Sequence, residues 1–207
     1  MREPGVSPGR KSDMTERAKI IFIHGASSSG KSTLAREIQT QISEPFWHVS
    51  IDHIRDSGML PMERFRRGDF HWREYRGRFF EGFHRSLVAY ASAGNNLLLE
   101  HILEEPEWAS DLALMFQPFD VFFVGLHCDL DELVRRETLR GDRRGGSAAD
   151  DFHRVHKGQR YDLQLRAGQT TADYTAQVIS AWTLRRSPSV FEELALEARA
   201  TATRFTR

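Results

Sequence analysis

Hydrophobic residues along the chain follow two patterns. Short apolar runs, rich in Ile, Leu, Val and Phe, predict strands that are buried on both faces of a sheet. These runs cover residues 18–25, 46–52, 95–100, 119–128 and 161–165. In the segments between them, apolar residues recur at helical spacing, as at Leu34, Ile38 and Ile42. Strands that alternate with helices predict a three-layer α/β fold with a five-stranded, mostly parallel sheet.

Helices are expected over about residues 31–42, 63–93, 107–116, 130–140 and 171–184, with a short helix in the tail over residues 186–207. In such folds, ligands bind at the carboxyl ends of the strands. Four residues lie at or just beyond those ends, namely Gly25, Asp52, Glu100 and Asp129. That edge of the sheet is the predicted active site.

The turn after the first run reads GASSSGKS and matches G-x-x-x-x-G-K-[ST] in full. Backbone N–H groups of such a loop, together with the helix N-terminus, bind phosphate oxygens. The residues expected to bind ATP are Gly25, Ala26, Ser27, Ser28, Ser29, Gly30, Lys31, Ser32 and Thr33. Lys31 is expected to contact the β- and γ-phosphates and Ser32 to bind Mg²⁺. A chance Gly/Ser-rich turn is the alternative, and the flanking strand and helix argue against it.

Asp52 ends the second apolar run, which places it at the predicted active-site edge of the sheet. Its chemistry there indicates which reaction the nucleotide site is expected to support. A carboxylate beside the γ-phosphate accepts the proton of an attacking hydroxyl and orients its oxygen. Asp52 is therefore the predicted catalytic base and a predicted substrate ligand. The alternative is a helix N-cap, since HIRDSGML follows it, and one aspartate can serve both purposes.

Glu100 ends the third run, where P-loop proteins commonly place the acid that holds Mg²⁺. Its carboxylate is expected to join the metal shell or to position a substrate hydroxyl. The alternative is an exposed strand-end carboxylate. The neighbouring Glu104, Glu105 and Glu107 are expected to be solvated charges at a helix start.

Arginines cluster around the end of the helix predicted over residues 130–140. A guanidinium that a mobile loop brings to the transferring phosphate stabilises the charge of the transition state. Arg136, Arg140 and Arg143 could share one helical face, and Arg140 and Arg143 are the predicted catalytic arginines of a lid over residues 139–150. The alternative is a solvated basic helix end.

Residues 63–84 interleave aromatic residues with arginines and are predicted to cover the substrate. Trp72, Tyr75, Phe79 and Phe83 would wall an acceptor, and Arg76 would contact a polar group on it. The simpler alternative is a helix with a core face and a solvated face. Such a mixture also suits single-stranded nucleic acid, which stays open as a partner.

Composition narrows the class of protein. Lys plus Arg equals Asp plus Glu at 29 each, which gives no electrostatic argument for a membrane or nucleic-acid partner. The single cysteine, Cys128, and the lack of an apolar stretch long enough for a membrane span suggest a cytoplasmic protein. Residues 1–17 are expected to be a disordered lead-in to one domain over residues 18–185. The nine histidines lack metal-site spacing and are expected to be structural or exposed.

From Ile20 to Trp182, the chain resembles the chloramphenicol phosphotransferase-like family of P-loop kinases. The most specific stretches are VGLHCDLDELVRRETLRGDRRGG and VHKGQRYDL, besides the P-loop and the aspartate in SIDHI. The resemblance implies an adenylate-kinase-like sheet, phosphorylation of an alcohol with Asp52 as general base, and ATP with Mg²⁺. Glu100 and His101 stand where the chloramphenicol enzyme has paired aspartates, and residues 63–78 differ in character. These departures lie in the residues expected to contact the molecule that accepts the phosphate.

The function predicted from the sequence is an ATP- and Mg²⁺-dependent O-phosphotransferase acting on a small hydroxylated molecule, with antibiotics such as chloramphenicol among the candidates. One alternative is a nucleoside, sugar or polynucleotide kinase, for which the arginine- and aromatic-rich segment would bind the acceptor. Another is a nucleotide-binding switch protein without transfer activity. Asp52 favours transfer, because a switch needs no base aimed at an acceptor.

Overall fold

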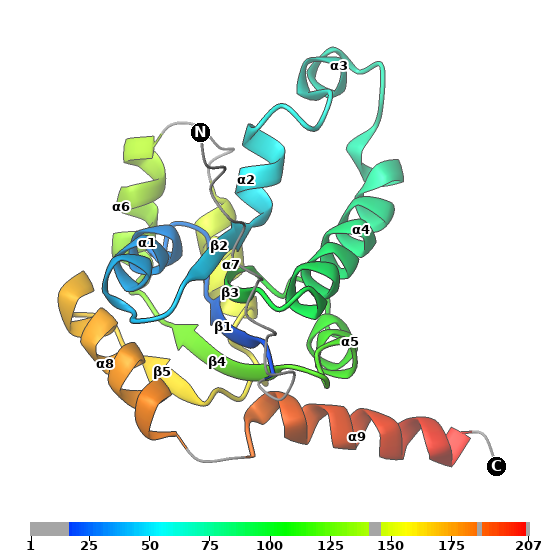
Figure 1. The fold of residues 1–207 in the computed structure, drawn as a ribbon. Coiled ribbons are helices and arrows are strands. Elements are labelled where there is room, and N and C mark those ends of the chain that lie inside the picture. Colours follow the sequence, from blue (N-terminus) through cyan, green and yellow to red (C-terminus); the bar gives the residue numbers. More distant parts are fainter. Residues whose placement is uncertain (1–16, 141–145, 186–187, 206–207) are drawn as a thin grey trace, which may run out of the picture.

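The computed structural model describes residues 17–140, 146–185 and 188–205 and shows a three-layer α/β fold (Figure 1). The strands are β1 (Lys19–His24), β2 (Phe46–Ser50), β3 (Asn96–Glu100), β4 (Asp120–Leu126) and β5 (Leu163–Leu165). They form one sheet in the order β2-β3-β1-β4-β5, with every pair parallel. The predicted five-stranded parallel sheet is confirmed.

Helices lie on both faces of this sheet (Figure 1). They are α1 (Lys31–Gln41), α2 (Ile51–Asp56), α3 (Met62–Arg67), α4 (Trp72–Ser92), α5 (Trp108–Met115), α6 (Leu130–Arg140), α7 (Ser147–Arg154), α8 (Thr171–Leu184) and α9 (Val190–Phe205). Side chains on successive positions of β1 point to opposite faces. Accordingly, Ile21 and Ile23 pack with residues of α1 and α8, whereas Ile20 and Phe22 pack with residues of α4, α5 and α9. This explains why β1 is apolar at every position from Ile20 to Ile23.

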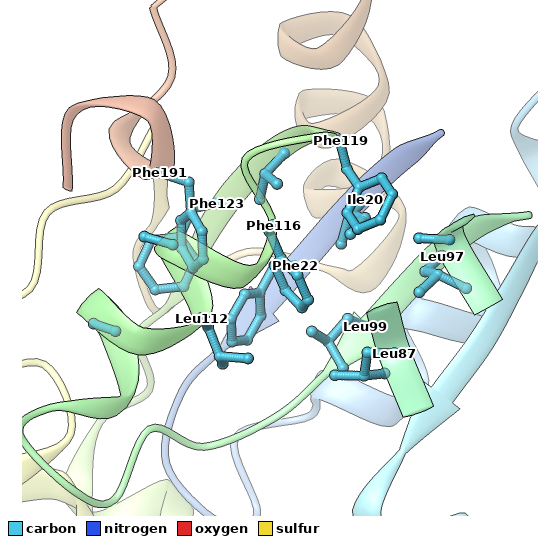
Figure 2. Packing of buried hydrophobic residues seen from close by; sticks show 14 of the residues in the cluster. Ile20, Phe22, Leu87, Leu97, Leu99, Leu112, Phe116, Phe119, Phe123 and Phe191 are labelled. Carbon is cyan, nitrogen blue, oxygen red and sulfur yellow. The ribbon is translucent and has the colours of Figure 1, made fainter. Parts of the chain in front are cut away.

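The C-terminal tail contributes to the core instead of adding only a short helix. Helix α9 spans 16 residues, and its Phe191 is buried among aromatic rings (Figure 2). The Phe191 ring centroid lies 5.0 Å from that of Phe123 and 5.6 Å from that of Phe22. The predicted length was wrong because the helix continues along α5, which supplies contacts that local sequence signals do not encode.

Other elements also differ from the prediction. Strand β2 ends at Ser50, because the Ser50 hydroxyl accepts a hydrogen bond from the His53 N–H and caps α2. The helix predicted over residues 63–93 is broken at Gly68, which adopts a left-handed conformation with φ of 82°. Residues expected to lie in the lid loop form α7. The lead-in predicted over residues 1–17 lies outside the described residues except for Arg17, which donates a hydrogen bond to the Pro118 carbonyl.

The stretch VHKGQRYDL serves the architecture. Asp162 accepts hydrogen bonds from the Phe123 N–H at 2.7 Å and the Val190 N–H at 2.8 Å, which tie β4 to the start of α9. The Tyr161 ring packs directly against Gly125, where a Cβ atom would lie 2.8 Å from the ring. These contacts hold β4 and β5 in place beside the P-loop.

No helix in the described ranges is long and apolar enough to cross a membrane.

Candidate active site

The P-loop follows β1 and wraps around the start of α1. Ser28 and Gly30 have positive φ angles of 63° and 99°, and a Cβ atom on Gly25 would lie 2.5 Å from the Leu126 carbonyl oxygen. The close approach to Leu126 requires glycine at Gly25, and the positive φ favours glycine at Gly30. The Lys31 ammonium is buried and donates hydrogen bonds to the carbonyls of Gly25 at 2.9 Å and Ala26 at 2.7 Å.

Helix α7 contacts the P-loop and helps to fix its conformation, a role that the sequence did not indicate. The Asp151 carboxylate accepts a hydrogen bond of 2.9 Å from the Ser27 N–H. The ring of His24 accepts from the Leu103 N–H at Nδ1 and donates from Nε2 to the Val155 carbonyl at 2.8 Å. Burial lowers the pKa of His24 from 6.5 to about 4, which keeps this ring neutral. Both contacts fix the loop before any nucleotide is bound.

A cleft of about 710 Å³ lies between the P-loop, α6 and the start of α8 and is a candidate nucleotide site. It is called the outer cleft below. Its lining includes Lys31, Ser32 and Thr33 from α1 and Arg136 from α6. Arg136 donates a hydrogen bond of 3.1 Å to the Ser29 carbonyl and is paired with Glu132. Other lining residues come from the β4–α6 and β5–α8 connections, such as His127, Cys128, Asp129, Gly168 and Gln169, and from the start of α8, such as Tyr174.

The predicted lid arginines cannot be placed in this cleft. Arg143 lies outside the described residues, and only the backbone of Arg140, at the end of α6, is described. Arg136, from the same cluster, is the arginine that contacts the P-loop. The two predicted catalytic roles therefore remain predictions.

Ser32 and Glu100 meet at the inner side of the P-loop. The Ser32 hydroxyl donates a hydrogen bond of 2.7 Å to Glu100 Oε1, and His48 Nε2 lies 3.1 Å from Glu100 Oε2. Burial raises the pKa of Glu100, but hydrogen bonds from His48 and Ser32 and the charge of Lys31 outweigh it, so the pKa is lowered overall. Glu100 is therefore an ionised, buried carboxylate rather than an exposed strand end.

This donor set fits Mg²⁺. Mg²⁺ prefers oxygen ligands and is usually held by one or two carboxylates together with substrate phosphates. Adjacent ligands of an octahedral Mg²⁺ lie about 3 Å apart, close to the 2.7 Å between the Ser32 and Glu100 oxygens. Within the part of the chain that the structure describes, no group of three or more His, Cys, Asp and Glu side chains could hold a metal by itself. Phosphate oxygens would have to complete the shell.

A second cavity, of about 320 Å³ and called the inner cavity below, shares Lys31 and Ser32 with the outer cleft. It sits beneath the arm formed by α2, α3 and the first part of α4, which projects from the sheet edge (Figure 1). The structure brings together in this cavity all five residues predicted to bind substrate, namely Asp52, Trp72, Arg76, Phe79 and Glu100. His101, which departs from the family pattern on the acceptor side, also lines the cavity. The sequence did not single out other lining residues, such as Ile51, Arg55, Leu60, Met62, Phe80 and Ile102.

Asp52 lies in the first turn of α2 and faces this cavity. It is not the helix N-cap, because Ser50 has that role. The Asp52 carboxylate is paired with Arg55, with 3.0 Å between Oδ1 and Nη1. Arg55 also makes two hydrogen bonds to Asp56. Arg55 thus holds Asp52 at the cavity wall.

Arg76 is held between two carboxylates that were expected to be solvated. Its guanidinium bonds to Glu105 at 2.6 Å and to Glu104 at 2.7 Å, and it lies over the rings of Phe80 and Trp108. Both glutamate side chains remain partly exposed, at 38% and 39%, and they are also ion-paired because α4 passes beside the β3–α5 loop. The charge of Arg76 is balanced within the protein.

Two of the predicted wall residues lie elsewhere. Phe83 belongs to the hydrophobic core. Tyr75 packs against Phe65 and Phe70 near the tip of the arm, with ring centroids 5.9 Å and 5.8 Å away. The apolar wall of the cavity is supplied instead by Trp72, Phe79 and Phe80, among others.

His84 and His101 form a buried pair at the base of the cavity, with 3.1 Å between their Nε2 atoms. Burial lowers the pKa of His84 from 6.5 to about 4. Burial lowers the pKa of His101 well below 6.5, and the positive charge of Lys31 contributes to this shift. Both rings are therefore neutral, so one Nε2 donates and the other accepts. The expectation that the histidines are structural or exposed fits this pair.

Residues 18–183 match the model of the family described as chloramphenicol phosphotransferase-like protein. The chain belongs to this family. It is also 28% identical over 166 residues to Rv2636 of Mycobacterium tuberculosis (strain H37Rv), whose name describes it provisionally as an O-phosphotransferase. That match covers 71% of this chain and 74% of the relative.

Solved structures of low sequence identity share the fold. The chain resembles the Mycobacterium tuberculosis APS kinase CysC with a TM-score of 0.63 and 18% identity, covering 81% of this chain and 99% of that one. For a gluconokinase from Sinorhizobium meliloti, the TM-score is 0.57 at 14% identity, covering 91% and 98%. For the Deinococcus radiodurans tunicamycin resistance protein, it is 0.58 at 14% identity, covering 83% and 99%. Family and fold together identify a P-loop kinase.

Proposed function

We propose that this kinase transfers the γ-phosphate of Mg²⁺-bound ATP to a hydroxyl group of an uncharged, largely apolar small molecule. One observation carries the proposal. Lys31 and Ser32 line both the outer cleft and the inner cavity, so the end of a phosphate chain bound by the P-loop would meet an acceptor from the inner side. Asp52 lines that inner side.

In the proposed mechanism, the acceptor hydroxyl lies beside Asp52, whose carboxylate accepts its proton as the oxygen attacks the γ-phosphate. Arg55 keeps that carboxylate in place through its ion pair. Lys31, which now contacts loop carbonyls, would turn to the phosphate oxygens when ATP binds. Ser32 and Glu100 would hold Mg²⁺, which neutralises charge on the phosphates.

The chemistry of the inner cavity supports an uncharged acceptor. Seven of its sixteen lining residues are apolar, and three of these are aromatic. The two arginines that line it, Arg55 and Arg76, are each paired with two carboxylates, and the positive charge of Lys31 is opposed by the negative charge of Glu100. An anionic acceptor would have to compete with those carboxylates for the arginines. Hydroxylated antibiotics such as chloramphenicol match this description better than nucleotides or nucleic-acid ends.

The cavity also argues against a switch protein without transfer activity, because a switch needs no second pocket with a carboxylate beside the P-loop. The test is an acceptor screen with ATP and Mg²⁺ in which mass spectrometry detects phosphate gain. Chloramphenicol, other hydroxylated antibiotics, nucleosides and sugars should each be paired with an anionic analogue, and RNA ends should be tested alongside them. We expect phosphorylation among uncharged compounds. Transfer only to anionic acceptors, or only to RNA ends, would contradict the proposed acceptor chemistry.

A further inference from the structure

His48 is the third residue of β2 and lies on the same face of the sheet as the P-loop helix. Residues two apart on a strand share a face, so His48 points to the same side as Phe46, which packs with residues of α1 and α8. Strand β2 pairs with β3 so that Ser50 stands beside Glu100. This register brings the His48 ring, two positions earlier, within reach of the Glu100 side chain.

The contact between them is buried and directional. His48 Nε2 lies 3.1 Å from Glu100 Oε2, and the two side chains are 6% and 9% exposed. Because an ionised carboxylate can only accept, Nε2 carries the hydrogen and donates. The opposite oxygen of Glu100 accepts from Ser32. Each oxygen of the Glu100 carboxylate thus accepts a hydrogen bond from a different side chain, and together the two bonds fix the rotation of the carboxylate group.

The His48 ring is itself held. It packs edge-on against His53, with ring centroids 4.6 Å apart and an interplanar angle of 76°. His53 is fixed in turn, because its N–H donates to the Ser50 cap of α2. The corner between β2 and α2 therefore places Asp52 and also orients the ring that contacts Glu100.

We propose that His48 is a positioning residue for the magnesium site, which holds the Glu100 carboxylate in the orientation that presents one oxygen beside the Ser32 hydroxyl. The inference rests on the proposed function only in taking Ser32 and Glu100 as oxygen donors to Mg²⁺. Groups that hydrogen-bond to a metal ligand set its orientation, and their loss typically lowers metal affinity or activity by about 10- to 100-fold. Without the hydrogen bond from His48, the Glu100 carboxylate could rotate away from Ser32. The two oxygens would then no longer be placed side by side for Mg²⁺.

The test measures metal binding directly and contains no acceptor. Mn²⁺, which also favours oxygen ligands, is titrated into the full-length protein saturated with ATP, and bound Mn²⁺ is followed by electron paramagnetic resonance. We expect His48→Leu to weaken Mn²⁺ binding on the order of tenfold. His48→Gln, which retains an N–H donor, should stay within about threefold of the wild type. Metal-free ATP binding, measured by calorimetry, should not change in either variant.

A matched control and a double variant distinguish the loss of Glu100 positioning from a general disturbance of the fold. Trp47→Leu alters the neighbouring residue of β2, whose half-exposed ring packs on Tyr90 away from the site, and should not affect Mn²⁺ binding. In a Glu100→Gln background, His48→Leu should cause no further loss. Equal Mn²⁺ affinity in the wild type and His48→Leu would overturn the proposal, as would an undiminished effect in the Glu100→Gln background.

Folding of each variant is checked by circular dichroism. If His48→Leu does not fold, His48→Asn, which is polar but too short to reach Glu100, is titrated in the same way with the same expected loss. Since no acceptor is present, these outcomes do not depend on phosphoryl transfer. A protein that shows the predicted Mn²⁺ dependence yet phosphorylates nothing would contradict the proposed function and leave the role of His48 supported.

Discussion

The Ser32 hydroxyl donates a hydrogen bond of 2.7 Å to Glu100 Oε1, across 68 residues of sequence. The bond joins the first turn of α1 to the last residue of β3. It lies where the outer cleft and the inner cavity adjoin, because Ser32 lines both. A metal held there would contact phosphates on one side and face the acceptor on the other.

Asp52→Asn should leave ATP affinity unchanged and lower the rate of transfer by about 10²- to 10⁴-fold, because an amide cannot accept the proton of the acceptor hydroxyl. Single-turnover kinetics with an acceptor from the screen would measure the rate, and calorimetry the affinity. Asp69→Asn is a matched control, since Asp69 is on the same arm and pairs with Arg64. Full activity in Asp52→Asn would exclude Asp52 as the base.

The double variant Glu104→Gln/Glu105→Gln should shift acceptor preference toward anionic compounds. The change leaves the charge of Arg76 without its two carboxylate partners. For such partly exposed pairs, we expect a gain of roughly two- to fivefold in kcat/KM for an anionic analogue relative to its uncharged parent. Glu81→Gln, which breaks the exposed pair with Arg85 on the same helix, should leave the ratio unchanged. An unaltered ratio in the double variant would argue against this source of selectivity.

Asp151→Ala should weaken ATP binding, because it removes the carboxylate that accepts the Ser27 N–H. Loss of one hydrogen bond to a charged group costs about 1.5–3 kcal/mol, and we expect part of this cost in nucleotide affinity. Calorimetry and thermal melting would divide the cost between binding and stability. Asp150→Ala, at the adjacent exposed position of α7, is the control and should behave as the wild type.

Gly125→Ala should destabilise the protein by about 1–3 kcal/mol, because overpacking forces neighbouring groups to move. A Cβ atom there would lie 2.8 Å from the Tyr161 ring. Adding Tyr161→Leu should recover part of the loss. Gly77→Ala, at an open position within α4, should instead stabilise the helix by about 0.5–1 kcal/mol. Chemical denaturation measures all three variants.

The stability of the protein should fall as the solution is acidified from pH 6.5 to pH 4. Burial lowers the pKa of His24 from 6.5 to about 4, so in this range the unfolded chain binds a proton that the folded protein does not. The free energy of unfolding then decreases by up to about 1.4 kcal/mol per pH unit for such a group. His24→Gln should reduce the slope of stability against pH. His153→Gln, at an exposed position of α7, should not, and an unchanged slope in His24→Gln would contradict the assignment.

Local patterns determined which segments form the framework. The all-apolar run of β1, the glycines of the P-loop and the spacing of Leu34 and Ile38 each depend on neighbours in sequence, so strand, turn and helix could be predicted. The carboxyl ends of parallel strands share an edge, which is why Asp52 and Glu100 could be predicted to lie near one another. Boundaries such as the Ser50 cap were missed, because Ser50 and Asp52 are both ordinary capping residues.

Contacts between distant segments were decided by the tertiary structure. Arg76 meets Glu104 and Glu105 only because α4 crosses beside the β3–α5 loop. In the same way, α7 contacts the P-loop through the hydrogen bond from the Ser27 N–H to the Asp151 carboxylate, which joins residues far apart in the sequence. The sequence by itself thus determined the fold, the phosphate-binding loop and the positions of the acids beside it. Which charges are already paired, and therefore which acceptor we propose, depended on side chains that no local periodicity brings together.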